Sequence, residues 1–220
     1  MKNKVVLGIC SLALVASSLS ADSFSKYAVA LKGGTLGGGL EVTTNITSNV
    51  NARVGVNAFN YSTSGVEEDI DYDIKLKLLT FEVLADYHPF ETSNFRLTGG
   101  VMYNGNKLEM NAKPSVAGLD IGDTNYNSTQ ISNLDVTVDF NDIAPYVGIG
   151  FGNAVKSAGF NFVADLGVIF QGTPKSEISV TGTAANAAAA DIAKEQADLD
   201  DALGSFKVYP VLAVGLSYRF

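Results

Sequence analysis

The chain ends in the stretch Pro210-Val-Leu-Ala-Val-Gly-Leu-Ser-Tyr-Arg-Phe220, in which large apolar side chains alternate with smaller or polar ones. Alternation with a period of two residues indicates an extended strand whose two faces meet different surroundings. The wholly apolar, partly aromatic face consists of Pro210, Leu212, Val214, Leu216, Tyr218 and Phe220. A soluble β-sandwich also contains strands of this kind, so the rest of the chain has to decide the fold class.

The same alternation recurs upstream, in segments joined by turns that are alternately short and long. The short turns lie at 47–49, 91–94 and 153–159, and the long polar loops at 62–71, 112–133 and 173–205. Outer-membrane β-barrels place short turns at the periplasmic rim and long loops outside. We therefore predict an all-β fold, an antiparallel up-and-down transmembrane β-barrel of eight strands. The predicted strands are 26–33, 35–46, 49–61, 71–89, 94–109, 136–152, 159–172 and 206–220.

Ten strands are the alternative, if Ser176–Thr181 pairs separately with part of the second long loop. Three places need special backbone geometry. Gly33-Gly-Thr35 must form a tight outer turn. The apolar alternation changes phase between Leu78 and Leu79, which predicts a β-bulge. Pro145 and Pro210 cannot donate a ladder hydrogen bond, so we expect each near a bulge or a strand end.

The outward faces of the predicted strands are apolar along the whole chain. They include Leu36, Leu40, Val42, Ile46, Val54, Phe81, Val83, Leu97, Val101, Val147, Ile149, Phe162 and Leu166. Outward aromatic side chains concentrate near the short turns, for example Tyr87, Phe95 and Phe160. Aromatic residues at the ends of a lipid-facing band are typical of membrane barrels.

Residues 1–21 are predicted to be a secretory signal peptide, and residues 22–220 the barrel. Lys2 and Lys4 provide the charged start, and Val5–Val15 the apolar run. This run is too short to cross a bilayer as a helix, which needs about 20 residues.

Composition limits the remaining function classes. Without Lys2 and Lys4, 13 basic residues face 23 acidic ones, so the mature chain has a net charge of −10, against −8 for the whole sequence. This charge argues against nucleic acid or another polyanion as a partner. Cys10 lies inside the signal, so no disulfide framework is expected. Lipoprotein processing at Cys10 is disfavoured by Ile9 before it.

The inward faces carry charge in balance, four basic and four acidic side chains. They are Lys32, Glu41, Arg53, Glu82, Asp86, Arg96, Asp165 and Arg219. A lipid-facing Arg or Lys costs roughly 2–4 kcal/mol at the bilayer midplane, so these side chains are expected inside. An eight-stranded barrel is barely wide enough for its own side chains, so we interpret the charges as a plug of paired ions. A gated ion path is the alternative.

The segment 184–203 is rich in alanine and acidic residues, and it ends at Gly204. This composition predicts a helix in the last outer loop. Ile192, Leu199 and Leu203 form an apolar stripe that is too narrow for a membrane anchor. We interpret the helix as a solvated cap, with a binding element or gate as the alternative.

Catalytic and metal-binding chemistry is sparse. His88 is the single histidine, and Asp86 is the carboxylate that could orient it as a general base. His88 lies beside a predicted periplasmic turn, whereas outer-membrane enzymes act near the outer leaflet, so we predict that the protein is not an enzyme. Glu67–Asp71 lacks the ligand spacing and the glycine of a dedicated Ca²⁺ loop. We expect no metal and no cofactor.

Four stretches carry a family resemblance. They are Leu31-Lys-Gly-Gly-Thr-Leu-Gly-Gly-Gly-Leu-Glu41, Leu84-Ala-Asp-Tyr-His-Pro-Phe90, Tyr103-Asn-Gly-Asn-Lys-Leu108 and Tyr209-Pro-Val-Leu-Ala-Val-Gly-Leu-Ser-Tyr-Arg-Phe220. In these the chain resembles a family of small outer-membrane β-barrel proteins of Gram-negative bacteria and, more broadly, the OmpA-type and OmpW-type barrel domains. The ending with Tyr218 and Phe220 is similar to the signal by which barrels are handed to the barrel assembly machinery. The resemblance implies the bacterial outer membrane as location, and it implies no activity.

These observations predict a monomeric, non-enzymatic outer-membrane barrel with a charge-plugged lumen. Its role would be structural, or a surface interaction through the outer loops. Its expected partners are outer-membrane lipid and lipopolysaccharide, and the assembly machinery during biogenesis. The alternative is an OmpW-type channel for small solutes or hydrophobic compounds.

Overall fold

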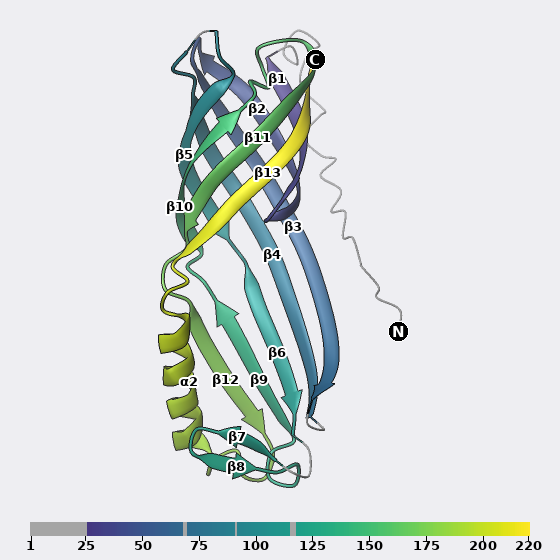
Figure 1. Ribbon diagram of the computed structural model, residues 1–220, viewed down its shortest axis with the longest axis vertical. Coiled ribbons are helices and arrows are strands. Elements are labelled where there is room, and N and C mark those ends of the chain that lie inside the picture. The colour runs from purple at the N-terminus through teal and green to yellow at the C-terminus, as the bar shows by residue number, and fades with distance from the viewer. Residues whose placement is uncertain (1–25, 68–69, 91, 115–117) are drawn as a thin grey trace, which may run out of the picture.

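The structure, a computed structural model, describes residues 26–67, 70–90, 92–114 and 118–220. The predicted signal peptide lies outside the described residues. One half of the molecule, at the top of Figure 1, contains β1 (Tyr27–Gly34), β2 (Gly37–Thr47), β3 (Val50–Glu67), β4 (Ile70–Tyr87), β5 (Phe95–Asn104), β10 (Ile143–Phe151), β11 (Gly159–Phe170) and β13 (Val208–Arg219). The other half adds β6 (Lys107–Lys113), β7 (Leu119–Ile121), β8 (Thr124–Tyr126), β9 (Asn133–Asp139), β12 (Lys175–Thr181) and the helix α2 (Ala189–Leu203).

Eight antiparallel strands form a closed ring. Its order is β1-β2-β3-β4-β5-β10-β11-β13, and β13 pairs with β1 to close it. The prediction of an all-β, up-and-down fold with eight strands in the ring and one short helix is therefore correct. The Ser176–Thr181 segment does form a strand, but β12 pairs with β9 outside the ring and adds no strand to it.

Beyond the ring the long strands β3 and β4 continue into an outer extension, a five-stranded sheet of order β3-β4-β6-β9-β12 (lower half of Figure 1). The predicted loop over 62–71 is wrong, because β3 and β4 stay paired up to Glu67 and Ile70. The other two predicted loops contain the hairpin β7–β8, the strand β12 and α2, which lies beside β12. The predicted helix over 184–203 is confirmed from Ala189 onward. Within the described ranges, no helix is long and apolar enough to span a membrane.

The outer extension has its own apolar core. Its buried residues are Ile70, Ala112, Ile121, Tyr126, Ile131, Leu134, Val136, Ile178 and Ala188. Ile192 and Leu199 of α2 pack against them, so the predicted helix stripe covers this core. The segments that join the strands of the ring therefore make up a folded layer rather than a set of separate loops.

The predicted bulge in β4 is wrong. The β3–β4 register runs without a shift from Val50 opposite Tyr87 to Glu67 opposite Ile70. The even-numbered residues of β4 face inward throughout, but they are apolar in the extension and, apart from Leu84, polar in the ring. The change of phase at Leu78 and Leu79 therefore marks a change of surroundings, not of backbone geometry.

The β1–β2 hairpin turns through Thr35 and Leu36, between the paired residues Gly34 and Gly37. Gly37 has a φ of +94°, a conformation that favours glycine. The turn therefore lies further along the chain than predicted. The lipid-facing assignment of Leu36 is wrong, because a residue in the turn escapes the strand alternation, and its side chain is buried inside the ring.

Both prolines in the ring lie near strand ends, as predicted. Pro145 precedes Tyr146, where pairing of β10 with β11 begins. Pro210 precedes Ala213, where pairing of β13 with β1 begins. Each proline is thus paired with one neighbouring strand only. Its missing N–H breaks no ladder, because the other side of the strand is unpaired at that residue.

Candidate functional site

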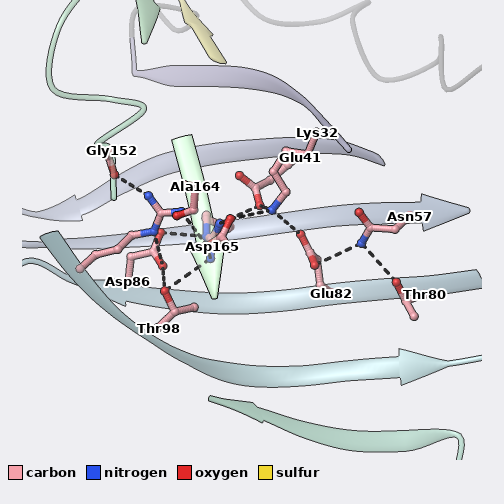
Figure 2. Close-up of polar contacts among 12 residues, drawn as sticks. Lys32, Glu41, Asn57, Thr80, Glu82, Asp86, Thr98, Gly152, Ala164 and Asp165 are labelled. Atoms are coloured by element: carbon pink, nitrogen blue, oxygen red, sulfur yellow. Dashed lines mark hydrogen bonds and ion pairs between the residues drawn. The ribbon is translucent and has the colours of Figure 1, made fainter. Parts of the chain in front are cut away.

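The interior of the ring contains a cluster of seven buried charged side chains, which we call the ion cluster (Figure 2). Its members are Lys32, Glu41, Arg53, Glu82, Asp86, Arg96 and Asp165, and each exposes at most 7% of its surface. They come from β1, β2, β3, β4, β5 and β11. Three cations thus face four carboxylates in a space closed to bulk water.

Arg53 lies at the centre of the ion cluster and contacts three carboxylates. Its Nη1 is 2.9 Å from Glu41 Oε2, its Nε is 2.8 Å from Asp86 Oδ2, and its Nη2 is 3.2 Å from Asp165 Oδ1. Charge-assisted hydrogen bonds from a planar guanidinium are strong and directional. Arg53 therefore ties its own strand, β3, to β2, β4 and β11.

The other two cations bridge carboxylates at the edges of the ion cluster. Lys32 Nζ lies 2.7 Å from Glu41 Oε2, 3.2 Å from Asp165 Oδ2 and 3.5 Å from Glu82 Oε1. Arg96 Nη2 lies 2.7 Å from Asp165 Oδ1. Glu82 has the weakest ionic support, because its one ion pair is the longest contact of Lys32.

Neutral polar side chains complete the ion cluster, and the sequence analysis missed them. Thr98 donates to Asp86 at 2.6 Å, while the amide of Asn57 donates to Glu82 at 3.3 Å and to Thr80 at 3.2 Å (Figure 2). All three lie at inward positions of their strands. The same alternation that identified the charges could have identified these residues.

Glycine makes room for Arg96, one of the two arginines of the ion cluster. Gly150 lies opposite Arg96 in the β5–β10 ladder. A Cβ on Gly150 would lie 2.6 Å from Arg96 Nε, so the guanidinium occupies the space that a side chain would fill. Arg96 Nη1 also donates to the Gly152 carbonyl, 2.5 Å away.

Arg219 and His88 lie apart from the ion cluster. Arg219 is half-buried and donates to the Val155 carbonyl at 2.6 Å, at the end of the ring that carries the short turns. His88 is buried just after β4, and its backbone N–H donates to the Asn49 carbonyl at 2.8 Å. Asp86 contacts Arg53 and Thr98 rather than orienting His88.

Apolar layers cover the ion cluster at both ends. Toward the outer extension lie Leu36, Leu84, Met102, Ala144, Tyr146, Ile169 and Val211, and toward the short turns lie Ala28, Ala154, Val155 and Val163. A cavity of about 10 Å³ beside Lys32, Arg53 and Tyr146 has room for roughly one water molecule. The interior is therefore filled by side chains.

The carboxylates of the ion cluster are not arranged to bind a metal, since within the described ranges no three His, Cys, Asp or Glu side chains are placed so that they could hold one. The carboxylates instead contact the cations and hydroxyl or amide donors of the protein itself. Such an arrangement can hold strands in register, and it offers no open site to a substrate or cofactor.

The outside of the ring carries a broad apolar belt. Its exposed members include Val29, Leu31, Val42, Val54, Phe81, Val83, Leu97, Val101, Val147, Ile149, Phe162, Leu166, Leu212, Val214 and Leu216. At its short-turn end the Tyr218 ring packs against Phe160 and Phe220, with centroid distances of 5.0 and 5.3 Å. Apart from Leu36, the outward side chains named from the sequence lie on this surface.

Comparison with known proteins gives the fold. The chain matches no family model and no curated protein sequence. Its structure is similar to Acinetobacter baumannii CarO2, with 19% identity, 88% of this chain and 98% of that chain covered, and a TM-score of 0.57. It is also similar to Acinetobacter baumannii CarO, with 19% identity, 89% and 97% covered, and a TM-score of 0.54.

Both are outer-membrane β-barrel proteins. At this level of identity the similarity shows the fold alone. The ring has the fold of a small outer-membrane β-barrel, and its apolar belt has the place of the lipid-facing band in such a barrel.

Proposed function

We propose that this protein is a closed outer-membrane β-barrel that holds its folded outer extension at the cell surface, in a structural or surface-interaction role and without enzymatic activity. The observation that carries the proposal is the ion cluster, buried between two apolar layers. A conducting pore needs a continuous wet path, and the filled interior argues against one.

Energetics support a permanently closed ring. Removing one partner from a buried ion pair typically costs about 3–5 kcal/mol, because the other charge stays buried without compensation. Arg53 contacts three carboxylates, so any opening that moved β3 would separate several pairs together. The ion cluster is thus suited to fixing strand register rather than to moving aside.

The outer extension supports the surface role. It has its own apolar core, and its outer sheet face is polar, with pairs such as Lys77–Glu109 and Lys107–Asp139. A folded layer presents a constant surface to other molecules, whereas separate loops would have to become ordered on binding. Its acidic helix α2 favours a partner with a basic or neutral surface.

We further propose that the barrel is a monomer that contacts outer-membrane lipid and lipopolysaccharide along its apolar belt. A closed ring needs no second copy to cover free strand edges. We propose that Tyr218 and Phe220 act as the assembly signal, a role in keeping with their outward position at the end of β13. Deleting Phe220 should then lower the yield of folded protein in cells, but not the stability of the refolded barrel.

The rival function is passage of small or hydrophobic solutes. A planar-bilayer measurement of single-channel conductance, together with uptake of small solutes into liposomes, separates the two. We expect no conductance steps and no uptake above protein-free liposomes, under conditions in which an open porin gives both. Reproducible conductance or solute uptake by the folded protein would overturn the closed-barrel proposal.

A further inference from the structure

At the β1–β2 hairpin the wall of the ring reaches least far toward the outer extension. β1 ends at Gly34, opposite Ala213, although β13 already begins at Val208. Pairing of β2 with β3 ends at Ala58, although β3 continues to Glu67. Figure 1 shows β3 and β4 continuing past this hairpin. Both neighbours of the hairpin therefore run beyond it and leave a gap between β3 and β13.

A groove of about 410 Å³ lies in this gap. Its walls are the side chains of Phe59, Leu76, Leu78 and Tyr209, and Thr35 together with glycine backbone of the hairpin forms the rest. Phe59 shares the inward-facing set of β3 residues with Asn57, yet it is 40% exposed. The described chain thus leaves an inward aromatic side chain uncovered at this point.

The hydroxyl groups beside the groove are already engaged within the protein. Thr35 Oγ1 donates to the Pro210 carbonyl at 3.0 Å and accepts from the Leu212 N–H at 3.2 Å. Tyr209 donates to the Thr35 carbonyl at 2.7 Å. The walls therefore offer hydrocarbon rather than hydrogen bonds, which suits an apolar ligand.

The mouth of the groove is continuous with the apolar belt. Gly38 pairs with Ala58, and Ala58 pairs with Leu79, the residue at which the outward face of β4 becomes apolar. Leu31 and Leu40 of the belt lie next to the hairpin tip. Gly33 and Gly38 carry no side chain at the mouth, and nothing lies within 4 Å of where their Cβ atoms would be. The groove thus opens toward the part of the belt nearest the outer extension.

We propose that this groove binds an acyl chain of a lipid in the surrounding outer leaflet. The chain would leave the bilayer at the hairpin and lie against Phe59 and Leu76, inside the line of the wall. The volume lies in the range of pockets that hold one small ligand, so it suits a single chain rather than a whole lipid. The inference goes beyond the closed-barrel function and rests on it only for the membrane location.

Fluorescence quenching tests the proposal, because the chain has no tryptophan. A Phe59→Trp variant carries a single reporter inside the groove, and a Tyr103→Trp variant carries one on the apolar belt of β5. Both are reconstituted in bilayers whose phospholipid acyl chains are brominated. We expect both reporters to lose fluorescence to a similar degree relative to unbrominated bilayers.

Filling the mouth provides the specific control. Adding Gly38→Leu to the Phe59→Trp variant should restore most of its fluorescence, since the new side chain enters open space at the entrance. Gly99→Leu is the matched control, because Gly99 of β5 also has nothing within 4 Å of a Cβ, and it should leave the quenching unchanged. Heat-modified migration on gels checks that each variant is folded.

Quenching of the Tyr103→Trp reporter alone would overturn the proposal that the groove binds an acyl chain, while leaving the membrane location intact. Absence of quenching in both reporters would contradict both the membrane location and the binding of an acyl chain in the groove. A brominated fatty acid added from water, with unbrominated lipid, tests the source of the chain. Quenching by that compound but not by brominated lipid would overturn the lipid assignment.

Discussion

The ring and the outer extension are built from the same long strands, yet they place polar and apolar side chains on opposite sides. In the ring, Glu82 of β4 is buried inside and Val83 is exposed outside. In the extension, Ile70 of the same strand is buried inside and Lys75 is exposed outside. The β3–β4 register continues through both without a shift.

The surroundings, rather than strand geometry, therefore decide which face of the strand is apolar. Where the outside is lipid, the strand directs hydrocarbon outward and encloses its charges. Where the outside is water, it encloses hydrocarbon and exposes charge. The exchange at Leu78 and Leu79 therefore gives the outer edge of the lipid-facing band to within about one residue of β4.

The largest expected effect comes from breaking the ion cluster. Arg53→Ala removes three contacts to buried carboxylates, so it should lower the free energy of unfolding by about 3–5 kcal/mol or prevent folding. Urea titration, followed by heat-modified migration on gels, measures the change. A loss below about 1 kcal/mol would show that the ion cluster does not stabilise the ring.

Glu82→Gln is the matched control within the ion cluster. Glu82 is as deeply buried, but its one ion pair is 3.5 Å long, and an amide can still accept from Asn57. Four carboxylates face three cations, so removing this charge brings the ion cluster closer to balance. We expect a change much smaller than for Arg53→Ala, and a comparable loss would contradict the central place given to Arg53.

The next largest loss of stability is expected from a charge placed inside the lipid-facing band, past its edge at Leu78 and Leu79. Lysine is native at outward position 77 of β4, where it contacts Glu109. Val83→Lys places the same side chain six residues further along the same face, inside the apolar belt. The expected cost is about 2–4 kcal/mol if position 83 lies near the bilayer midplane. Urea titration in lipid vesicles measures it, and a tolerated lysine at 83 would place the boundary elsewhere.

The sequence predicted the ring well, because alternation fixes which side each residue faces once a strand is recognised. It failed for residues 62–67, since Ser62-Thr-Ser-Gly65 has the composition of a turn and is held extended by pairing with β4. It failed for Leu36, because its assignment depends on where the hairpin turns. Both errors concern tertiary context rather than local propensity.

The sequence predicted which charged side chains face inward, but not which of them meet in the ion cluster. Alternation places Arg53, Arg96 and Arg219 on inward faces alike. Which carboxylate each cation meets depends on the tilt and stagger of strands around the ring, and a single sequence does not specify these. Arg219 thus shares the predicted face but lies at the short-turn end with Val155.

A smaller change, in the attachment of α2 to the outer extension, is expected when the pH is lowered. Hydrogen bonds from the Ser176 hydroxyl and backbone N–H hold the pKa of Asp200 below its usual value of 3.8, and the Tyr126 hydroxyl lowers the pKa of Asp191. A lowered folded-state pKa stabilises attachment above pH 3.8, and this stabilisation is lost as the pH falls through the folded value.

Amide hydrogen exchange in α2, corrected for the intrinsic rate, should therefore be constant from neutral pH to about pH 5 and rise at lower pH. Asp200→Asn keeps an acceptor for Ser176 and should reduce this dependence on pH. An increase in exchange around neutral pH would contradict the assignment, because neither carboxylate changes its charge there.

The smallest change in stability is expected for an exposed ion pair of the outer extension. Compared with a buried pair of the ring, it distinguishes the two regions most clearly. Lys107 pairs with Asp139 at 3.0 Å on the polar face of the extension, where both side chains are more than one-third exposed, whereas Lys32 pairs with Glu41 at 2.7 Å inside the ring. Lys107→Ala should change stability by no more than about 1 kcal/mol, and added salt should shrink the change further, since exposed pairs are screened. Lys32→Ala should cost several times more and respond weakly to salt, because its partners stay buried. Parallel urea titrations at low and high salt compare the two variants, and similar costs would show that burial does not distinguish the ring from the extension.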